Sequence, residues 1–415
     1  MDSWKQTQEN ALTEPIFRDE YFRKKPKKHG REWKIIDAPE MFVPVADTHA
    51  HLQMLADPAL AIARAAVHKV RFIETMVDPA DLAEGSESPD VQAAEESHVE
   101  EALEDGVAGA WNDEAGPLSA ASVADDNPAH AAAQSAPAVR DVFSRDETTA
   151  PLLTDTGNPT FDLLPDWRLE ASVLMRSMGT RICGQGHNSL PGIRIAVGVH
   201  PHNASKWSIW LEELVIRLMH DRRVSAVGEI GLDYHYDYSP RDVQKDVFAV
   251  QLELAKQAGL PVLLHVREAF DDAFEMMQRT GWNDAGVLLH CYTSDADEIR
   301  RWVDAGCYVA FGGAFTFKKS DALREAAPLV PRDRLLTETD APFMTPEPFR
   351  GISCEPGHVV FTAERVFNYL ERDDAASEVI FSDDTDTMRR RFLTQTYENA
   401  VRLLDRPPTS WQEDF

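Results

Sequence analysis

The chain has 415 residues, 43% of them hydrophobic, and a formal net charge of −28 at pH 7. An acidic surface repels phosphate, so this composition excludes nucleic-acid binding through a general basic face and leaves metal ions or a local basic patch as the means of binding. The four cysteines include no Cys-X-X-Cys pair, and there is neither a signal-peptide pattern nor a long apolar run, so we expect a cytoplasmic protein without a membrane span.

Residues 1–40 are predicted to form a polar N-terminal arm. The arm contains a basic cluster, Arg23-Lys24-Lys25-Pro26-Lys27-Lys28. A solvated, flexible arm is the simpler interpretation of this cluster, and an arm that contacts phosphate is the alternative.

After the arm, short apolar runs alternate with stretches of helical pattern. The apolar runs are predicted strands at 43–47, 70–77, 193–199, 224–229, 261–265, 286–290, 307–311 and 334–338. The stretches between them are predicted helices at 58–68, 206–220, 240–258, 269–279, 296–305 and 322–330. Strands that are apolar almost throughout indicate a sheet that is buried on both faces and therefore parallel.

Eight such strands alternating with helices predict a closed (β/α)8 barrel of the TIM type, formed by 41–77 and 158–405. An open doubly wound sheet is the alternative. That fold usually has a glycine-rich phosphate loop after its first strand, whereas this chain has Asp47-Thr48-His49-Ala50-His51 there.

Residues 78–157 are predicted to be a long, disordered, acidic insertion between strands 2 and 3. From 78 to 155 the segment has nineteen acidic and two basic residues, a formal net charge of −17, and it is rich in Ala, Ser, Pro and Gly. Such a composition cannot bury enough apolar surface to offset the entropy of an ordered chain. Residues 406–415 are predicted to be a C-terminal tail.

Imidazoles and carboxylates recur where the predicted strands end. They are His49, His51, His200, His202, Glu229, Asp233, His265, His290 and Asp340. The carboxyl ends of the strands build the active site in such barrels, and these side chains are the usual ligands of zinc, manganese and iron. His49 and His51 are two residues apart, so on an extended strand they point to the same face, where one metal can accept both.

The carboxylates favour two metals. Glu229 can bridge two cations, and Asp340 can bind one of them and also accept a proton from the attacking water. Paired cations about 3.5–4 Å apart are a recurring device for phosphoester hydrolysis. They would also let an acidic protein bind a phosphate backbone.

Several segments together resemble the successive motifs of the TatD family of deoxyribonucleases. They are Asp47–Leu52 (DTHAHL), Gly198–His202 (GVHPH), Gly228–Tyr234 (GEIGLDY), Pro261–Arg267 (PVLLHVR), His290–Tyr292 (HCY) and Glu338–Pro342 (ETDAP). The likeness extends over about 43–77 and 194–404. The acidic insertion departs from the family pattern. So does Arg350–Pro356, where Cys354 replaces an Asn and the family's Lys is absent.

The resemblance implies a (β/α)8 barrel with two divalent cations that cuts phosphodiester bonds of DNA with a metal-activated water. Mg²⁺ or Mn²⁺ is implied for activity, with Zn²⁺ as the alternative. The implied metal ligands are His49, His51, Glu229, His265, His290 and Asp340.

Asp340, Glu229 and His200 are the expected catalytic residues, and Arg267 and His202 are the candidates for substrate binding. His200 could contact the scissile phosphate. Arg267 could clamp a phosphate, with a structural ion pair as the simpler interpretation. For His202 the simpler interpretation is a capping or packing role.

Family members also act on other substrates, including aminoacylated tRNA, so the fold alone does not fix the substrate. DNA is the expected partner, with RNA or tRNA as alternatives. A second hypothesis is therefore a hydrolase of acyl or amide bonds, such as an aminoacyl-tRNA deacylase. A third is a non-catalytic binding protein, against which the intact ligand set argues.

Overall fold

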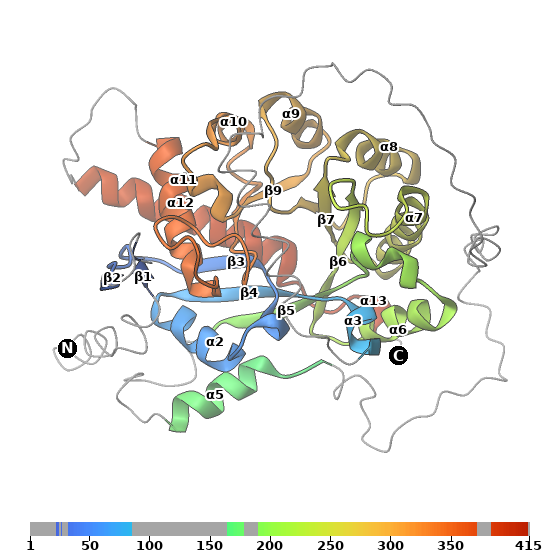
Figure 1. The fold of residues 1–415 in the computed structure, drawn as a ribbon, viewed down its shortest axis with the longest axis horizontal. Coiled ribbons are helices and arrows are strands. Elements are labelled where there is room, and N and C mark those ends of the chain that lie inside the picture. The colour runs from blue at the N-terminus through green and yellow to red at the C-terminus, as the bar shows by residue number, and fades with distance from the viewer. Residues whose placement is uncertain are drawn as a thin grey trace.

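The computed structural model of the chain describes residues 22–24, 26, 32–84, 164–177, 190–371 and 383–413 (Figure 1). Most of the predicted insertion, from 85 to 157, lies outside the described residues, and so do Lys25, Lys27 and Lys28 of the basic cluster. The predictions of disorder and of a phosphate-contacting arm therefore stay predictions.

Eight strands form a single parallel sheet in the order β10-β9-β8-β7-β6-β5-β4-β3. They are β3 (Val45–Ala50), β4 (Val70–Val77), β5 (Gly192–Val197), β6 (Val224–Asp233), β7 (Val262–Arg267), β8 (Val287–Leu289), β9 (Tyr308–Phe311) and β10 (Leu335–Thr337). The first and last strands meet through a parallel bridge between Ala50 and Ala341. This closure confirms the predicted (β/α)8 barrel.

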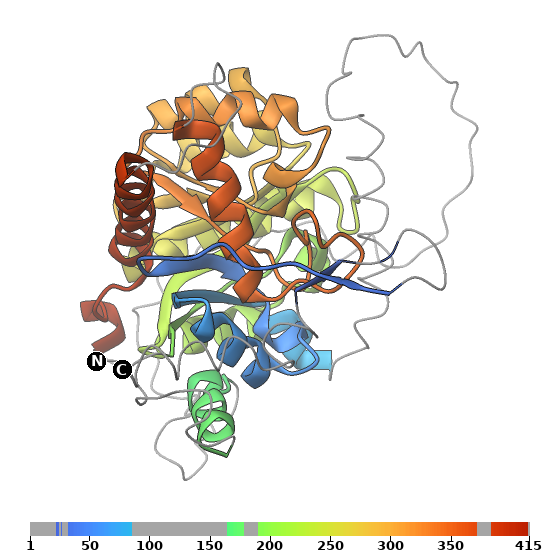
Figure 2. The same cartoon turned by 90° about the vertical axis from the view of Figure 1, so that its left-hand side faces the viewer.

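Helices surround the strands (Figures 1 and 2). They are α2 (Pro58–Val67), α3 (Pro79–Glu84), α5 (Trp167–Ser177), α6 (Ile209–Met219), α7 (Arg241–Ala258), α8 (Phe270–Thr280), α9 (Ala296–Asp304), α10 (Asp321–Ala326), α11 (Val359–Glu371), α12 (Asp383–Leu404) and α13 (Ser410–Glu413). Side chains satisfy several helix starts, as where Ser208 Oγ accepts a hydrogen bond from Leu211 N at 3.2 Å. Within the described residues, no helix is long and apolar enough to cross a membrane.

The barrel interior is a small apolar cluster of its own. Its strand residues are Ala46, Phe72, Met76, Ala196, Ala226, Leu263, Leu288, Ala310 and Leu336. Three residues of α12, Ala400, Leu403 and Leu404, complete this cluster. Asn399 of α12 donates to Leu335 O, at the start of β10. The helix therefore closes the amino-terminal end of the barrel and leaves the carboxyl end for the functional residues.

The structure corrects the predicted organisation at three places. The predicted C-terminal tail is packed on the barrel, because α13 lies within it and the buried Gln412 side chain donates to Met219 O at 3.0 Å. The predicted polar arm is partly packed: Phe22 is fully buried against Phe349 and Phe361, next to a short antiparallel pair of strands, β1 (Arg23–Lys24) and β2 (Lys34–Ile35). The insertion does not begin at 78, because residues 79–84 form α3. Burial of the Phe22 ring holds the arm, and the hydrogen bonds of Asp78 hold the start of the predicted insertion. Both depend on partners far away in the chain, so no local sequence pattern predicts them.

Candidate metal centre

The predicted metal ligands come together at the carboxyl end of the barrel. His49 lies on β3, Glu229 on β6 and His265 on β7. His51, His290 and Asp340 follow β3, β8 and β10 directly or after a few residues. Residues from five strands meet there because parallel strands end at the same rim.

Glu229 stands at the middle of this cluster and is 7% exposed. Its Oε2 lies 3.4 Å from Nε2 of His49 and 3.9 Å from Nε2 of His51. Its Oε1 faces three other imidazoles: His265 (Nδ1, 2.6 Å), His290 (Nε2, 2.8 Å) and His200 (Nε2, 3.8 Å). The two oxygens of one carboxylate therefore point to two different groups of donors.

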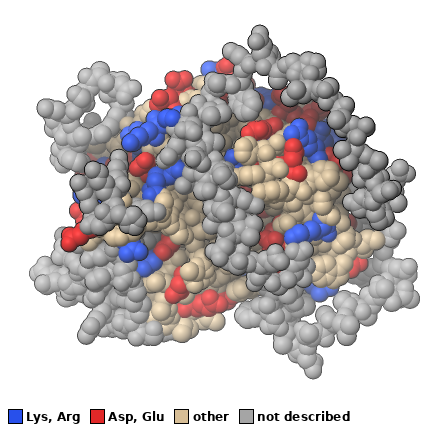
Figure 3. Space-filling view, viewed as in Figure 1, with Lys and Arg blue, Asp and Glu red and all other residues tan. Residues whose placement is uncertain are grey.

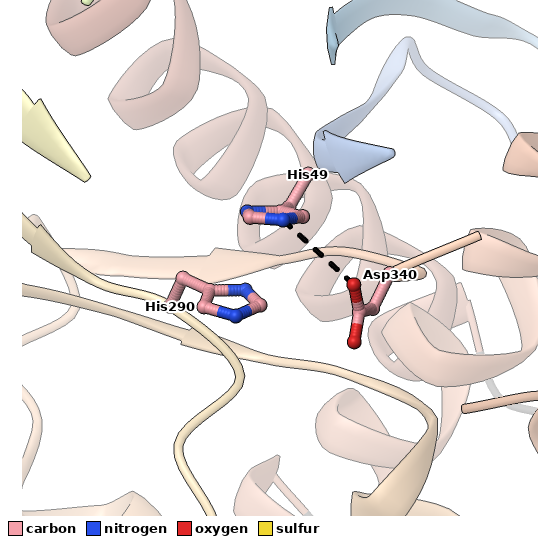
Figure 4. A group of neighbouring side chains, drawn as sticks. All are labelled: His49, His290 and Asp340. Carbon is pink, nitrogen blue, oxygen red and sulfur yellow. Dashed lines mark ion pairs between the residues drawn. The ribbon is translucent and has the colours of Figure 1, made fainter. Parts of the chain in front are cut away.

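Asp340 closes the first of these groups. Its Oδ1 lies 3.4 Å from Nε2 of His51 and 3.7 Å from Nε2 of His49. The His49 ring stacks on the His290 ring with centroids 3.7 Å apart, and Asp340 lies beside both (Figure 4). The backbone N of Asp340 donates to His49 O at 2.9 Å, which ties the residue to β3.

Two buried carboxylates orient the imidazoles from behind. Asp233 Oδ2 lies 2.9 Å from Nε2 of His265 and 3.1 Å from Nε2 of His202. Glu338 Oε1 lies 3.1 Å from Nδ1 of His290. A carboxylate that accepts from one ring nitrogen leaves the other nitrogen as a lone-pair donor, which fixes the ring for metal binding.

Sequence reasoning assigned no role to Asp233 and missed Glu338 altogether. Both lie in motifs that were quoted for the family resemblance, at strand ends beside a ligand. Their position at strand ends could have indicated a role beside the ligands. Their partners, His265 for Asp233 and His290 for Glu338, are 32 and 48 residues away in the chain, so the pairing itself has no local signal.

Gly231 allows β6 to approach β7 closely beside His265. It has a φ of 149°, and a Cβ at this position would meet His265 O at 1.9 Å. No other residue type fits this position, which explains the glycine in the segment Gly228–Tyr234.

The carboxylates and imidazoles of the cluster shift one another's pKa values. Burial alone raises the pKa of Glu229, but the imidazoles of His290 and His49 outweigh it and hold this pKa well below its usual value. Burial alone lowers the pKa of His290, yet Glu229 raises it well above its usual value. Burial holds the pKa of His49 and that of His200 below the usual value, so these two rings keep a lone pair for a metal at neutral pH.

The donor atoms fit divalent cations. Three groups each bring their donor atoms within 4.8 Å of one another: His49, His290 and Asp340; His49, His51 and Glu229; and His200, Glu229 and His265. Nε2 of His49 faces Nε2 of His51 at 3.4 Å. Imidazole nitrogens and carboxylate oxygens that converge in this way are a ligand set for zinc, manganese or a similar cation.

The remaining predicted site residues lie around this cluster. His200 was expected to be a catalytic residue that could contact the scissile phosphate, and the structure groups it with Glu229 and His265 as a candidate ligand. His202 is 25% exposed and paired to Asp233. Arg267 ends β7, and its guanidinium lies over the Tyr236 ring at 4.9 Å. Among the described residues, Arg267 does not form the structural ion pair that was the simpler interpretation of it.

A family model for TatD related DNase matches residues 169–403, which is more than half of the chain. The chain belongs to the TatD family of metal-dependent hydrolases. The resemblance seen in the motifs is thus confirmed, and with it the assignment as a hydrolase whose barrel holds the candidate metal ligands.

Two relatives illustrate the range of this family. Metal-dependent hydrolase YabD of Bacillus subtilis strain 168 is 39% identical over 204 residues, which is 48% of this chain and 77% of the relative. The 3'-5' ssDNA/RNA exonuclease TatD of Escherichia coli K12 is 34% identical over 186 residues, which is 43% of this chain and 70% of the relative.

Solved structures of TatD-family proteins share the fold. YJJV, a TatD homolog from Escherichia coli K12, superposes with a TM-score of 0.52 at 18% identity and covers 88% of this chain and 100% of its own. A TatD-family hydrolase from Entamoeba histolytica gives a TM-score of 0.53 at 14% identity, with 89% and 100% covered. At these identities the likeness concerns the barrel alone.

Proposed function

We propose that this TatD-family hydrolase is a nuclease that cleaves phosphodiester bonds of DNA at a centre with two divalent cations. The observation that carries the proposal is the position of Glu229, whose two oxygens face two separate donor groups. A carboxylate shared by two cations is a recurring device in phosphoester hydrolysis. The relative named a 3'-5' ssDNA/RNA exonuclease supports a single-stranded substrate.

Each donor group would hold one cation. His49, His51, Glu229 and Asp340 would hold the first, and Glu229, His200 and His265 the second. His290 touches Glu229 Oε1 and also belongs to a group with His49 and Asp340, so it lies between the two. Mg²⁺ or Mn²⁺ is the proposed metal and Zn²⁺ the alternative. Bound there, the cations would neutralise phosphate charge and lower the pKa of a bound water.

The side chains of this chain would do the remaining work. Asp340 is 14% exposed, so its carboxylate can reach a water molecule and accept the proton of the attacking water. Arg267, whose guanidinium lies over Tyr236, would bind a phosphate next to the scissile one. His202, held by Asp233 and partly exposed, would contact the substrate from the same side.

The charge distribution is consistent with a metal-based mode of binding. On the face shown in Figure 3, basic and acidic side chains are interspersed in small groups over the described surface. With a net charge of −28 for the whole chain, the positive field that attracts a phosphate backbone would come from the metal centre and a few arginines beside it.

The test combines metal analysis of the purified protein with nucleotide release from single- and double-stranded DNA, with and without a chelator. We expect two divalent ions per chain, and release that stops on chelation and returns with Mn²⁺. A protein that holds the metals, releases nothing from DNA under any metal and deacylates charged tRNA would replace the nuclease assignment with an acyl hydrolase.

A further inference from the structure

The loop that follows β6 carries tyrosines at alternate positions, Tyr234, Tyr236 and Tyr238. Tyr234 is engaged within the protein: its hydroxyl donates to Asp272 at 2.6 Å, and the guanidinium of Arg241 lies over its ring at 4.2 Å. The other two rings stack on each other, with centroids 5.2 Å apart and an interplanar angle of 10°. Tyr238 keeps 48% of its surface exposed.

The loop is fixed to the metal centre by hydrogen bonds. Asp233, which also orients His265, accepts hydrogen bonds from the backbone N of His235 and of Tyr236, both at 3.0 Å. At the other end of the loop, Ser239 Oγ donates to His202 O at 2.9 Å. The tyrosine pair therefore has a defined position relative to the candidate ligands.

A short chain of rings joins the tyrosines to the centre. His202 lies edge-on to Tyr238 at 4.8 Å and to Tyr236 at 5.4 Å, and it lies edge-on to His200 at 4.3 Å. The path from His200 to Tyr238 thus spans no more than about three nucleotides at the ~3.4 Å spacing of a stacked strand.

A cation accompanies the rings. The guanidinium of Arg267 lies 4.9 Å from the centre of the Tyr236 ring. Aromatic faces beside a positive charge are the elements with which proteins bind single-stranded nucleic acid, because the base stacks on the ring and the phosphate pairs with the cation. Only unpaired bases present both faces for such stacking.

We propose that Tyr236 and Tyr238 form a stacking surface, the tyrosine platform, for one nucleobase of a single-stranded substrate within three nucleotides of the scissile bond. Arg267 contacts the phosphate that adjoins this base. The proposal rests on the proposed nuclease function and adds to it the residues that position one base of the single strand and the phosphate beside that base.

The experiment measures affinity and cleavage for a single-stranded oligonucleotide, and for matched oligonucleotides with one abasic residue moved through the three positions next to the cleaved end. Affinity is measured on phosphorothioate versions with Mn²⁺ present. Tyr238→Ala is expected to weaken binding of the intact strand about tenfold, as for loss of one stacked base. Tyr238→Phe, which keeps the ring face, is expected to bind like the wild type.

The abasic series identifies the cause. At one position, removal of the base should weaken the wild type about as much as Tyr238→Ala does, and the two changes together should cost no more than either alone. Trp33→Ala is the matched control. Trp33 is 40% exposed, contacts Arg23 and directly precedes β2, which lies on the opposite side of the molecule from β6 in Figure 1. It should leave binding unchanged.

Two outcomes overturn the proposal and are distinguishable. If the wild type cleaves DNA but Tyr238→Ala weakens intact and abasic strands equally, or weakens neither, the platform is wrong and the nuclease assignment stands. If the metal-loaded wild type neither binds nor cleaves any oligonucleotide, the nuclease assignment fails first and the platform fails with it.

Discussion

Asp340 combines two features at the centre. Its carboxylate faces His51 and His49 at 3.4 and 3.7 Å, and its backbone adopts a left-handed φ of 62° while its N–H donates to His49. A non-glycine residue in this region is uncommon and is held by its surroundings. Backbone contacts between the ends of two strands therefore hold Asp340 in position, and this does not require its carboxylate.

The Asp340→Asn variant should therefore fold normally and lose catalysis. Asn keeps the shape and one oxygen but cannot accept the proton of the attacking water, so we expect kcat on single-stranded DNA to fall about 10²–10⁴-fold. Affinity for an uncleavable strand should change much less. Asp333→Asn, which alters an exposed carboxylate at the other end of β10, is the control. Turnover like that of the wild type at saturating Mn²⁺ would remove Asp340 from the mechanism.

At the scale of elements, the start of the acidic insertion belongs to the barrel. Asp78, the residue after β4, accepts hydrogen bonds through Oδ2 from His200 N at 3.0 Å and from the Asn203 side chain at 2.8 Å. Asp78 thereby holds the loop that carries His200, and α3 continues the chain before the described residues end at 84. A boundary drawn at 78 from charge alone therefore assigns α3 to the insertion.

Replacing residues 85–155 with a Gly/Ser linker should leave folding and metal content nearly unchanged, because the composition of that segment predicts no core of its own. A second deletion that starts at 78 should lower the thermal midpoint and the metal content, since it removes the Asp78 contacts. Thermal unfolding and metal analysis check both. Loss of soluble protein in the first variant would show that the segment packs on the barrel.

At the scale of the whole molecule, a buried acid lies among the apolar side chains of the barrel interior. Glu74 shares a face of β4 with the inward Phe72 and Met76, is fully buried, and accepts a hydrogen bond from Ser225 at 2.7 Å. Burial raises the pKa of Glu74 to about 8. The folded protein therefore keeps a proton that the unfolded chain releases near its ordinary pKa of 4.5.

The proton held by Glu74 makes the stability of the folded protein depend on pH. Between about pH 4.5 and 8 the folded state binds more protons at Glu74, so its contribution to the free energy of unfolding is full below pH 4.5 and is lost as pH rises through 8. Glu74→Gln cannot ionise, so the variant should match the wild type near pH 5 and exceed it near pH 8, by on the order of a few kcal/mol.

Urea unfolding of both proteins at the two pH values is the measurement. Glu398→Gln, at an exposed position of α12, should leave the difference between the two pH values unchanged. Equal stability of wild type and Glu74→Gln at both pH values would show that Glu74 is ionised in the folded protein or is not buried in solution.

The sequence by itself determined the class of fold and the place of the chemistry. Apolar runs alternating with helical stretches require a parallel sheet, and parallel strands in a barrel all end at one rim. Histidines and carboxylates placed at strand ends, such as His49, His265 and Asp340, must then meet. Local sequence patterns and the repeating unit of strand and helix are enough for these predictions, because neither depends on distances between side chains.

Only the tertiary structure decided which donors face each other. The two oxygens of Glu229 select different partners, Glu338 orients His290, and Phe22 packs on a barrel that was predicted to exclude it. The physical reason is the same in each case. These contacts join residues far apart in the chain, and their geometry depends on strand register and side-chain packing, for which a linear sequence has no local signal.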